Sequence, residues 1–193
     1  MKKLPFLLWI GGAGLILYLL LRPERIEARE PTMHDFIVYL AKDRYEQFYR
    51  RGLPKDDASQ IASSVIKWCN ERNLNIFSVL AIIEQESYFN PKAKGIIGEK
   101  GLMQLSDTAL DELERVYGIK VDRERIFDID YNIELGTLYY LYCVRLANGK
   151  RFEAIARYHM TFHPEYEAAK RYAEEVMAKR DKIVSMYKKF IEK

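Results

Sequence analysis

Two short runs contain the residues with the clearest chemistry. The first is AIIEQESYFNP at positions 81–91, and the second is GLMQ at positions 101–104. In the first run, Glu86 lies at the end of an apolar stretch that is typical of a helix. Desolvation at such a place raises the pKa of a carboxyl group and keeps it protonated at neutral pH, so that it can act as a general acid. A proton donor of this kind is the group that breaks a glycosidic bond.

The position of Glu86 on its helix favours burial. Phe77, Leu80 and Ile83 lie nine, six and three residues before it, so we expect Glu86 to share a stripe that faces the core. Glu84 points to another side and is expected to face solvent. From this pattern alone a structural ion pair explains a buried Glu86 equally well, because such pairs also bury carboxylates.

The elements that must position these runs are predicted to be helices. Apolar spacing and turn residues predict helices over about 36–48, 61–68, 76–87, 107–117, 131–146 and 152–160, and a last one from Pro164 to about Phe190. Asn75, Ser106 and Asp130 are the expected N-caps of the third, fourth and fifth of these helices. Asn148-Gly149 is typical of a tight turn.

The segment 90–105 has a different character. Gly95, Gly98 and Gly101 permit backbone conformations and close approaches that other residues resist, so we expect an ordered loop or short hairpin beside the third helix. The sequence shows no internal repeat and no sustained strand alternation. The predicted fold class is therefore all-α with one loop-rich lobe.

Composition and charge set the outer limits. The 193 residues are 49% hydrophobic, which is enough for one medium domain with a buried core. The net charge is +3, and without Lys2 and Lys3 it falls to +1, with 29 basic against 28 acidic side chains. A nucleic-acid-binding protein would carry a concentrated basic face, so this class is excluded as a first hypothesis.

The N-terminus is predicted to be a membrane anchor. Residues 4–21 carry no charge, and this length is about the minimum for a membrane span. A cleaved signal peptide is the rival, but its apolar core should be shorter and should lead into a small-x-small site. We therefore expect an uncleaved anchor over 1–21, followed by a charged tether over 22–33. Basic residues flank the anchor on both sides, so charge alone does not decide its orientation.

The cysteines and histidines give no metal-site pattern. Cys69 and Cys143 lie 74 positions apart, and buried free thiols are at least as good an interpretation as a disulfide. His34, His159 and His163 do not form a metal-ligand set. No metal and no cofactor is expected.

The ordered motifs resemble those of the soluble lytic transglycosylase (SLT) family, lysozyme-like enzymes that cleave bacterial peptidoglycan. The resemblance rests on Glu86-Ser87, Phe89-Asn90-Pro91, Gly98, Gly101-Leu102-Met103-Gln104-Leu105, Thr108-Ala109, Asn132-Ile133, Leu135-Gly136, Ala154-Ile155-Ala156-Arg157-Tyr158, Tyr172 and Val176. It covers about 75–176 and implies a lysozyme-like domain over 34–193.

The resemblance implies a mechanism with one carboxylate. Glu86 would protonate the oxygen between N-acetylmuramic acid and N-acetylglucosamine and would then take a proton from the muramyl 6-hydroxyl. That hydroxyl attacks the anomeric carbon, so the product is a 1,6-anhydro sugar and no water is consumed. Glu99 is the other acidic residue of the loop, and its simplest interpretation is a solvated side chain.

The resemblance also implies a set of substrate-binding residues, namely Ser87, Gly101, Met103, Gln104 and Tyr158. The glycine would let the backbone approach the glycan, and the amide of Gln104 would donate to it and accept from it. Alternatives stay open from the residues themselves. Met103 could fill a gap, Ser87 could end the helix, and Tyr158 could pack in the core. Asn132 is expected to be a structural contact.

One departure from the family is Tyr158-His159-Met160-Thr161, where Tyr-Asn-Ala-Gly is common. It affects the expected shape of the sugar subsites. A goose-type lysozyme-like hydrolase and a non-catalytic peptidoglycan-binding scaffold are the rival functions.

The implied substrate also gives an expected location. Peptidoglycan lies outside the cytoplasmic membrane, so the domain should face the periplasm or cell wall, held to the membrane through residues 4–21. The expected partners are glycan strands and the membrane. An envelope or secretion machinery is a further candidate partner that the sequence does not identify.

Overall fold

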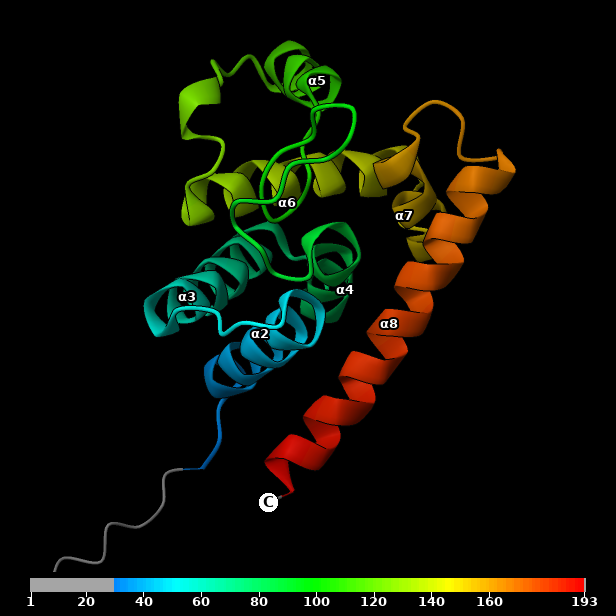
Figure 1. The fold of residues 1–193 in the computed structure, drawn as a ribbon. Coiled ribbons are helices and arrows are strands. Elements are labelled where there is room, and N and C mark those ends of the chain that lie inside the picture. The colour runs from blue at the N-terminus through cyan, green and yellow to red at the C-terminus, as the bar shows by residue number, and fades with distance from the viewer. Residues whose placement is uncertain (1–29, 193) are drawn as a thin grey trace, which may run out of the picture. The chain divides into compact units, whose positions relative to one another are not determined.

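The structure is a computed structural model that describes residues 30–192, which fold into helices joined by turns and loops (Figure 1). These are α2 (Met33–Tyr49), α3 (Lys55–Arg72), α4 (Ile76–Ser87), α5 (Asp107–Tyr117), the 3-10 turn η1 (Arg123–Arg125), α6 (Ile129–Leu146), α7 (Arg151–His159) and α8 (Glu167–Ile191). The predicted all-α fold class is confirmed.

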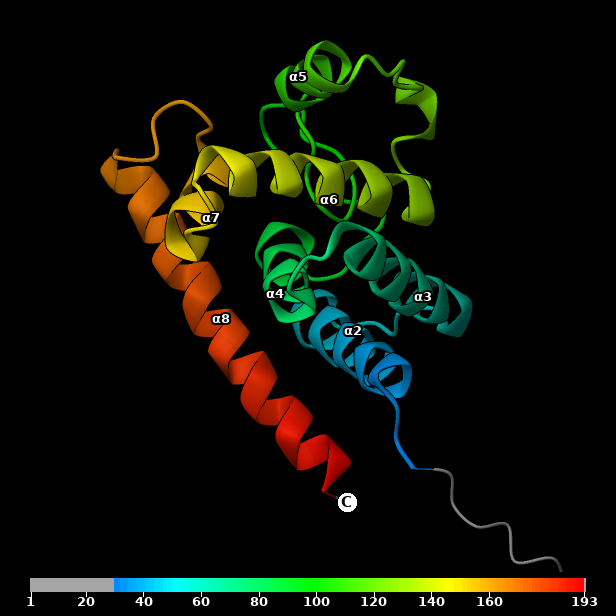
Figure 2. The ribbon, with the colours of Figure 1, turned by 180° about the vertical axis from the view of Figure 1, so that it is seen from behind.

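Helix α4 lies among the other helices and is buried on all sides. Every residue from Ser78 to Glu84 is buried, so this helix has no solvent face. Helix α8 packs along α4 and α7, α2 packs on α3, and α6 packs on α3 and α7. In both views of Figures 1 and 2, α6 lies between α5 on one side and α3 and α4 on the other.

Two of the three predicted N-caps are confirmed. Asn75 and Ser106 accept hydrogen bonds from the backbone N–H of Ser78 and Ala109 at 3.1 Å each. The prediction for Asp130 is wrong, because α6 begins two residues earlier, at Ile129, and Asp130 lies in its first turn. There its Oδ1 accepts a hydrogen bond from Nε1 of Trp68 at 3.0 Å.

The last helix begins later than predicted. Pro164 is outside α8, which starts at Glu167. Residues 163–166 form a turn instead, in which the N–H of Tyr166 donates to the carbonyl of His163 at 3.2 Å. The two rings stack with centroids 4.7 Å apart, and this local contact holds the turn.

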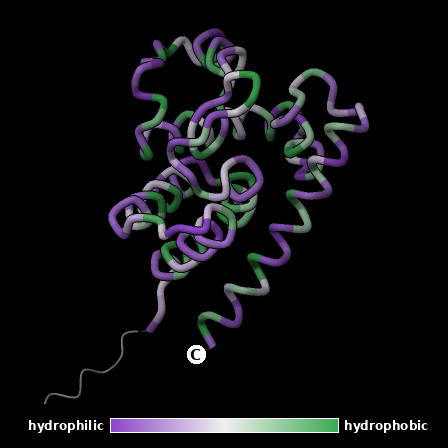
Figure 3. The backbone as a smooth tube through the Cα atoms, viewed as in Figure 1, coloured by the Kyte–Doolittle hydropathy of each residue, from purple (hydrophilic) through white to green (hydrophobic). Residues whose placement is uncertain are grey.

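Helix α8 has one apolar face that covers α4. Its buried residues are Ala169, Tyr172, Ala173, Val176 and Ile183, which follow the spacing of one helix face. Figure 3 shows the corresponding alternation of hydrophobic and hydrophilic positions along α8. Near its end, Tyr187 and Phe190 contact Phe36 of α2, with ring centroids 5.1 and 5.5 Å apart. The long helix is thereby packed against α4 along its apolar face and against α2 near its C-terminal end.

The two cysteines are free and buried. Burial raises the pKa of Cys69 to about 12 and also raises the pKa of Cys143. Both thiols are therefore protonated and inert at neutral pH.

The predicted anchor over 1–21 and most of the predicted tether lie outside the described residues. Within residues 30–192, none of the helices combines the length and apolar character that a membrane crossing needs. The described chain enters α2 through Thr32, whose side chain and backbone exchange hydrogen bonds with Asp35 in a capping box.

Candidate active site

Glu86 lines a cavity of about 370 Å³, which we call the cleft. Its walls come from the end of α4, the loop 90–105, the start of α5, the middle of α6 and the end of α7. Besides Glu86, they include Ile97 and Glu99 of the loop, the segment 104–109, and Tyr139, Tyr158 and His159. The cleft thus gathers side chains that are far apart in the sequence around one carboxyl group.

Two residues with left-handed backbone conformations follow the last residue of α4, Ser87. Tyr88 and Phe89 have φ values of 47° and 62°, in the left-handed region that residues other than glycine usually avoid. Packing holds both residues there, because Phe89 is fully buried and the ring of Tyr88 stacks on Phe48 at 4.0 Å. The chain therefore leaves the helix axis at once, and the Glu86 carboxyl remains at the end of the helix.

The carboxyl of Glu86 is held from α8. Its Oε1 accepts a hydrogen bond from the hydroxyl of Tyr172. Burial raises the pKa of Glu86 to about 7, the negative charge of Glu99 adds to the rise, and the hydrogen bond from Tyr172 opposes it. The predicted rise is confirmed. A carboxyl group with this pKa is partly protonated at neutral pH, which is the requirement for a general acid.

The imidazole ring of His159 packs against the ring of Tyr172. The two rings are stacked, with centroids 4.7 Å apart and an interplanar angle of 9°. Burial lowers the pKa of His159, so its ring is neutral at pH 7. The flat contact fixes the plane of the Tyr172 ring and hence the direction of its hydroxyl group.

Three helices fix the segment 101–104 through its backbone. Ser87 of α4 donates to the carbonyl of Leu102 at 2.8 Å, and Tyr158 of α7 donates to the carbonyl of Met103 at 2.7 Å. Asn132 of α6 accepts from the N–H of Met103 at 2.9 Å and donates to the carbonyl of Lys100 at 3.0 Å. The expected structural role of Asn132 is confirmed.

Gly101 and Gln104 shape the same segment from within. Gly101 has φ +78°, and a Cβ there would lie 2.3 Å from Nδ2 of Asn132, so no other residue fits. The Nε2 of Gln104 donates to the carbonyls of Gly101 and Ala93 at 2.8 and 3.2 Å. The β-bridges of Lys100 with Lys94 and with Leu105 complete the ordered loop that the glycines predict.

A family model described as the transglycosylase SLT domain matches residues 63–180. The chain belongs to this family. The matched segment includes Glu86, the loop, Tyr158 and Tyr172, so the whole cleft lies in the SLT domain.

Solved structures share the fold of this SLT domain. One is an inactive mutant of the lytic transglycosylase Slt from Pseudomonas aeruginosa, with 20% identity over 81% of this chain and 31% of that chain, and a TM-score of 0.61. Another is the soluble lytic transglycosylase SLT70 from Escherichia coli, with 17% identity over 82% of this chain and 31% of that chain, and a TM-score of 0.60.

A complex of the 70-kDa soluble lytic transglycosylase with bulgecin A is also similar, with 18% identity over 78% of this chain and 30% of that chain, and a TM-score of 0.57. The chain thus spans under a third of the length of these proteins. A search of curated proteins returns no significant match.

The SLT domain brings some of the predicted site residues together and separates others. Glu86, Gln104 and Tyr158 line the cleft, whereas Ser87, Gly101 and Met103 do not. Ser87 and Gly101 fix the backbone of the loop. Met103 is fully buried and packs where Gly136 leaves room, since a Cβ at Gly136 would lie 2.3 Å from its Sδ. These three residues therefore hold the loop in place without lining the cleft.

Several residues at the site are not among the predicted ones, and Glu99, His159 and Tyr172 are the most important of them. Tyr172 belongs to the residues that carry the family resemblance, and this is the one signal in the sequence that points to it. The interpretation of Glu99 as a solvated side chain misses its place, because the residue is half-buried and lines the cleft. Only the folded arrangement shows that these side chains face Glu86.

Glu84 does not face solvent, so that prediction is wrong. Its side chain is only 9% exposed and lies between two cations, with Nε of Arg44 at 3.2 Å and Nζ of Lys179 at 3.7 Å. Because α4 is covered on all sides, a residue two positions from Glu86 is buried as well. The pair of cations compensates its charge.

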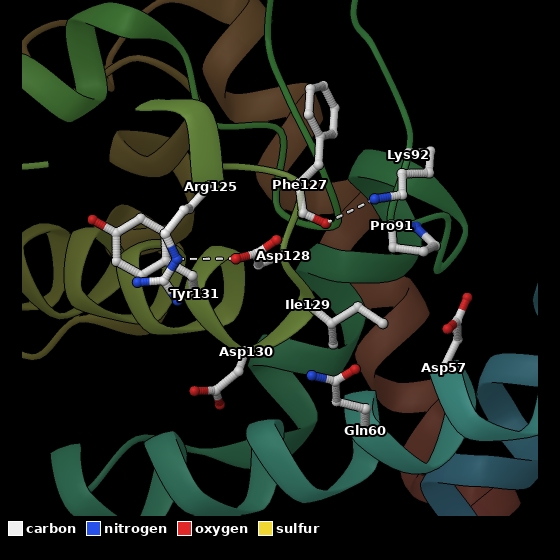
Figure 4. Close-up of a pocket in the computed structure, with 10 residues that line it drawn as sticks. All are labelled: Asp57, Gln60, Pro91, Lys92, Arg125, Phe127, Asp128, Ile129, Asp130 and Tyr131. Atoms are coloured by element: carbon white, nitrogen blue, oxygen red, sulfur yellow. Dashed lines mark hydrogen bonds and ion pairs between the residues drawn. The ribbon is translucent and has the colours of Figure 1, made fainter. Parts of the chain in front are cut away.

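A second cavity, of about 320 Å³, lies at the start of α6 (Figure 4). Some of its polar side chains have partners inside it. Arg125 contacts Asp128 at 3.0 Å and lies 4.6 Å from the ring centroid of Tyr131, and Lys92 donates to the carbonyl of Phe127 at 3.5 Å (Figure 4). It contains neither Glu86 nor any other predicted site residue. The cleft is therefore the candidate active site of the SLT domain.

Proposed function

We propose that this chain is a peptidoglycan lytic transglycosylase, a lyase that cleaves the β-1,4 bond between N-acetylmuramic acid and N-acetylglucosamine. The observation that carries the proposal is Glu86, a carboxyl group whose pKa is raised to about 7 and whose side chain faces a cleft. Membership of the SLT domain family supports it. The similar enzyme from Pseudomonas aeruginosa is inactive as a mutant in which glutamine replaces a glutamate.

Glu86 acts first as an acid and then as a base. In its protonated form it donates to the bridging oxygen as the bond to the anomeric carbon breaks, while the acetamido group of the sugar stabilises the developing positive charge. The ionised Glu86 then takes the proton of the muramyl 6-hydroxyl, whose oxygen bonds to the anomeric carbon. The 1,6-anhydro sugar forms, and Glu86 regains its starting proton.

The hydrogen bond from Tyr172 is compatible with both steps of the reaction. Its hydroxyl donates to Oε1, so it favours the ionised carboxylate that the second step needs, while burial favours the protonated acid of the first. The two opposing effects keep the pKa near neutrality. Neither form is then too stable for the proton to move in both directions during one turnover.

The glycan binds against the segment 101–104 and α7 in this proposal. Gln104 has used its Nε2 inside the loop, which leaves its Oε1 to accept from a sugar hydroxyl or amide. Ser87, Gly101 and Met103 contribute by fixing the backbone next to the sugar. The hydroxyl of Tyr158 is bound to the loop, so its ring is the part that contacts the glycan.

The proposed location is outside the cytoplasmic membrane, with residues 4–21 as a single-pass anchor and the N-terminus inside. The substrate is the argument, because peptidoglycan lies beyond that membrane. Partners in an envelope or secretion machinery would be reached from the same side.

A goose-type hydrolase is the second candidate, and one observation favours it. Glu99 places a second carboxylate in the cleft, and most glycosidases use two. In that case a water molecule would take the place of the 6-hydroxyl. The two reactions differ in the mass of the product.

The first test is the release of soluble fragments from purified peptidoglycan by the full-length protein. Glu86→Gln should release none, and Glu124→Gln, an exposed carboxylate of η1, should behave as the wild type. Equal release by the wild type and Glu86→Gln would contradict the proposed role of Glu86. A wild-type protein that binds glycan and releases nothing would be a scaffold module.

A further inference from the structure

Glu99 is a half-buried carboxylate without a partner in the described part of the chain. It lines the cleft with Glu86, and no side chain of residues 30–192 forms a hydrogen bond or ion pair with its carboxylate. The neighbouring cation Lys100 points elsewhere, with its Nζ 3.0 Å from Oδ1 of Asp107. The carboxylate of Glu99 is therefore available to a group that enters the cleft.

The backbone of the loop fixes where this carboxylate lies. The N–H of Gly95 donates to the carbonyl of Glu99 at 2.8 Å and closes the loop between the two residues. A Cβ on Gly95 would lie 2.1 Å from Oε2 of Glu99 and 2.9 Å from Oε1 of Gln104. The absence of a side chain at Gly95 therefore creates the space that the Glu99 carboxylate occupies, next to the amide oxygen of Gln104.

Two acceptor oxygens thus lie together at the wall of the cleft, and one of them belongs to a carboxylate. They favour a positive charge or a donor in the cavity before them. Cleavage of a glycosidic bond creates such a charge, because the ring carbon and ring oxygen become an oxocarbenium ion in the transition state. An ionised carboxylate placed in advance stabilises this charge without reorganising when it forms.

We propose that Glu99 is a second acidic residue of the active site, and that its ionised carboxylate stabilises the positive charge that develops on the sugar ring. The inference rests on the proposed function and deepens it. Glu86 remains the proton donor and acceptor. Glu99 forms no covalent bond and transfers no proton, so the bonds made and broken are the same as in the proposed reaction.

The charge of Glu99 also acts on Glu86 directly. The groups that face Glu86 are Tyr172 of α8, Tyr158 and His159 of α7, and Glu99 of the loop. Of these, Glu99 carries a negative charge, which raises the pKa of Glu86. Removing that charge should lower the pKa of Glu86. If Glu99 had a merely structural role, this pKa would not change.

The test compares Glu99→Gln with the wild type and with Glu124→Gln, whose carboxylate is exposed and remote. We expect Glu99→Gln to lower kcat by about 10- to 100-fold on soluble glycan strands, with KM within about 3-fold. The pH at which activity declines on the alkaline side should move down, and carboxyl-carbon NMR should show the same fall in the pKa of Glu86. Glu124→Gln should change none of these.

A second variant separates the position of the charge from its presence. Gly95→Ala keeps Glu99 but places a Cβ where its carboxylate lies, so kcat should fall while the protein stays folded. If the wild type cleaves glycan and Glu99→Gln has the same kcat and pH profile, the Glu99 proposal is overturned and the proposed function stands. If the wild type cleaves nothing, the proposed function fails, and the proposal fails with it.

Discussion

The hydroxyl of Tyr172 on α8 donates a hydrogen bond to Oε1 of Glu86, and the two residues are 86 positions apart in the chain. The two preceding residues of α4 also contact α8. Nε2 of Gln85 lies 2.8 Å from Oε2 of Glu175, and Oε1 of Glu84 lies 3.7 Å from Nζ of Lys179. Three consecutive residues of α4 are thus tied to α8, so the placement of α8 sets the position of the Glu86 carboxyl.

Tyr172→Phe should raise the pKa of Glu86, because the lost hydrogen bond favours the carboxylate. The activity of the wild type should decline as the pH rises through about 7, where Glu86 loses its proton. In the variant the decline should begin at a higher pH, and kcat should fall by about 10-fold because the carboxyl loses its orientation. The measurement is kcat against pH.

Tyr166→Phe is the matched control, since that tyrosine is 50% exposed and lies outside the cleft. If the activity of Tyr172→Phe declined at the same alkaline pH as that of the wild type, the hydrogen bond would not influence the pKa of Glu86.

Glu86→Gln should stabilise the protein at alkaline pH. The pKa of Glu86 is raised from its ordinary value of 4.5 to about 7, so the folded state holds the proton more tightly than the unfolded state. The stability that this proton supplies is present below the ordinary pKa and is lost as the pH rises through about 7. Glutamine does not ionise, so at pH 8 the variant should gain roughly 1 to 3 kcal/mol over the wild type, relative to their difference at pH 4.

Urea unfolding at the two pH values measures this change. A difference in the free energy of unfolding that does not vary with pH would show that Glu86 titrates alike in the folded and unfolded states.

Glu84→Ala should destabilise the fold. The substitution leaves Arg44 and Lys179 without their shared anion in a nearly buried place, which typically costs about 3 kcal/mol. Glu174→Ala on the exposed side of α8 should change the free energy of unfolding by less than about 0.5 kcal/mol. Denaturant titration of both variants checks this, and equal stabilities would rule out a structural ion pair at Glu84.

Gly101→Ala should lose both stability and activity. The residue has φ +78°, and its new Cβ would lie 2.3 Å from Nδ2 of Asn132, which holds the loop. Gly149→Ala is the matched control, because Gly149 has nearly the same φ, +79°, and no atom lies within 4 Å of the new Cβ. It therefore measures the cost of the backbone strain without a steric clash. We expect Gly149→Ala to cost about 1 kcal/mol and Gly101→Ala at least about 2 kcal/mol. Equal losses would mean that Asn132 moves aside freely.

Local signals were enough to predict much of the fold. Helix α4 has the predicted bounds, since Asn75 caps its start and the residues before Pro91 end it. The errors come from contacts between distant segments. The burial of Glu84 depends on Arg44 and Lys179 from two other helices, and a one-face stripe cannot describe a helix that is covered all round.

The candidate site divides in the same way. Glu86, Gln104 and Tyr158 belong to local motifs, so the sequence identifies them. Tyr172 reaches the Glu86 carboxyl only because α8 packs on α4. Glu99 reaches it because Gly95 leaves space for its carboxylate, which the spacing of the loop residues does not reveal.

The mass of the products tests the central claim most directly. Muropeptides released from purified peptidoglycan by the full-length protein should be one water lighter than hydrolytic products, because the 6-hydroxyl attacks in place of water, and Glu86→Gln should release none. Products of full hydrolytic mass, or anhydro products that persist in Glu86→Gln, would contradict the account.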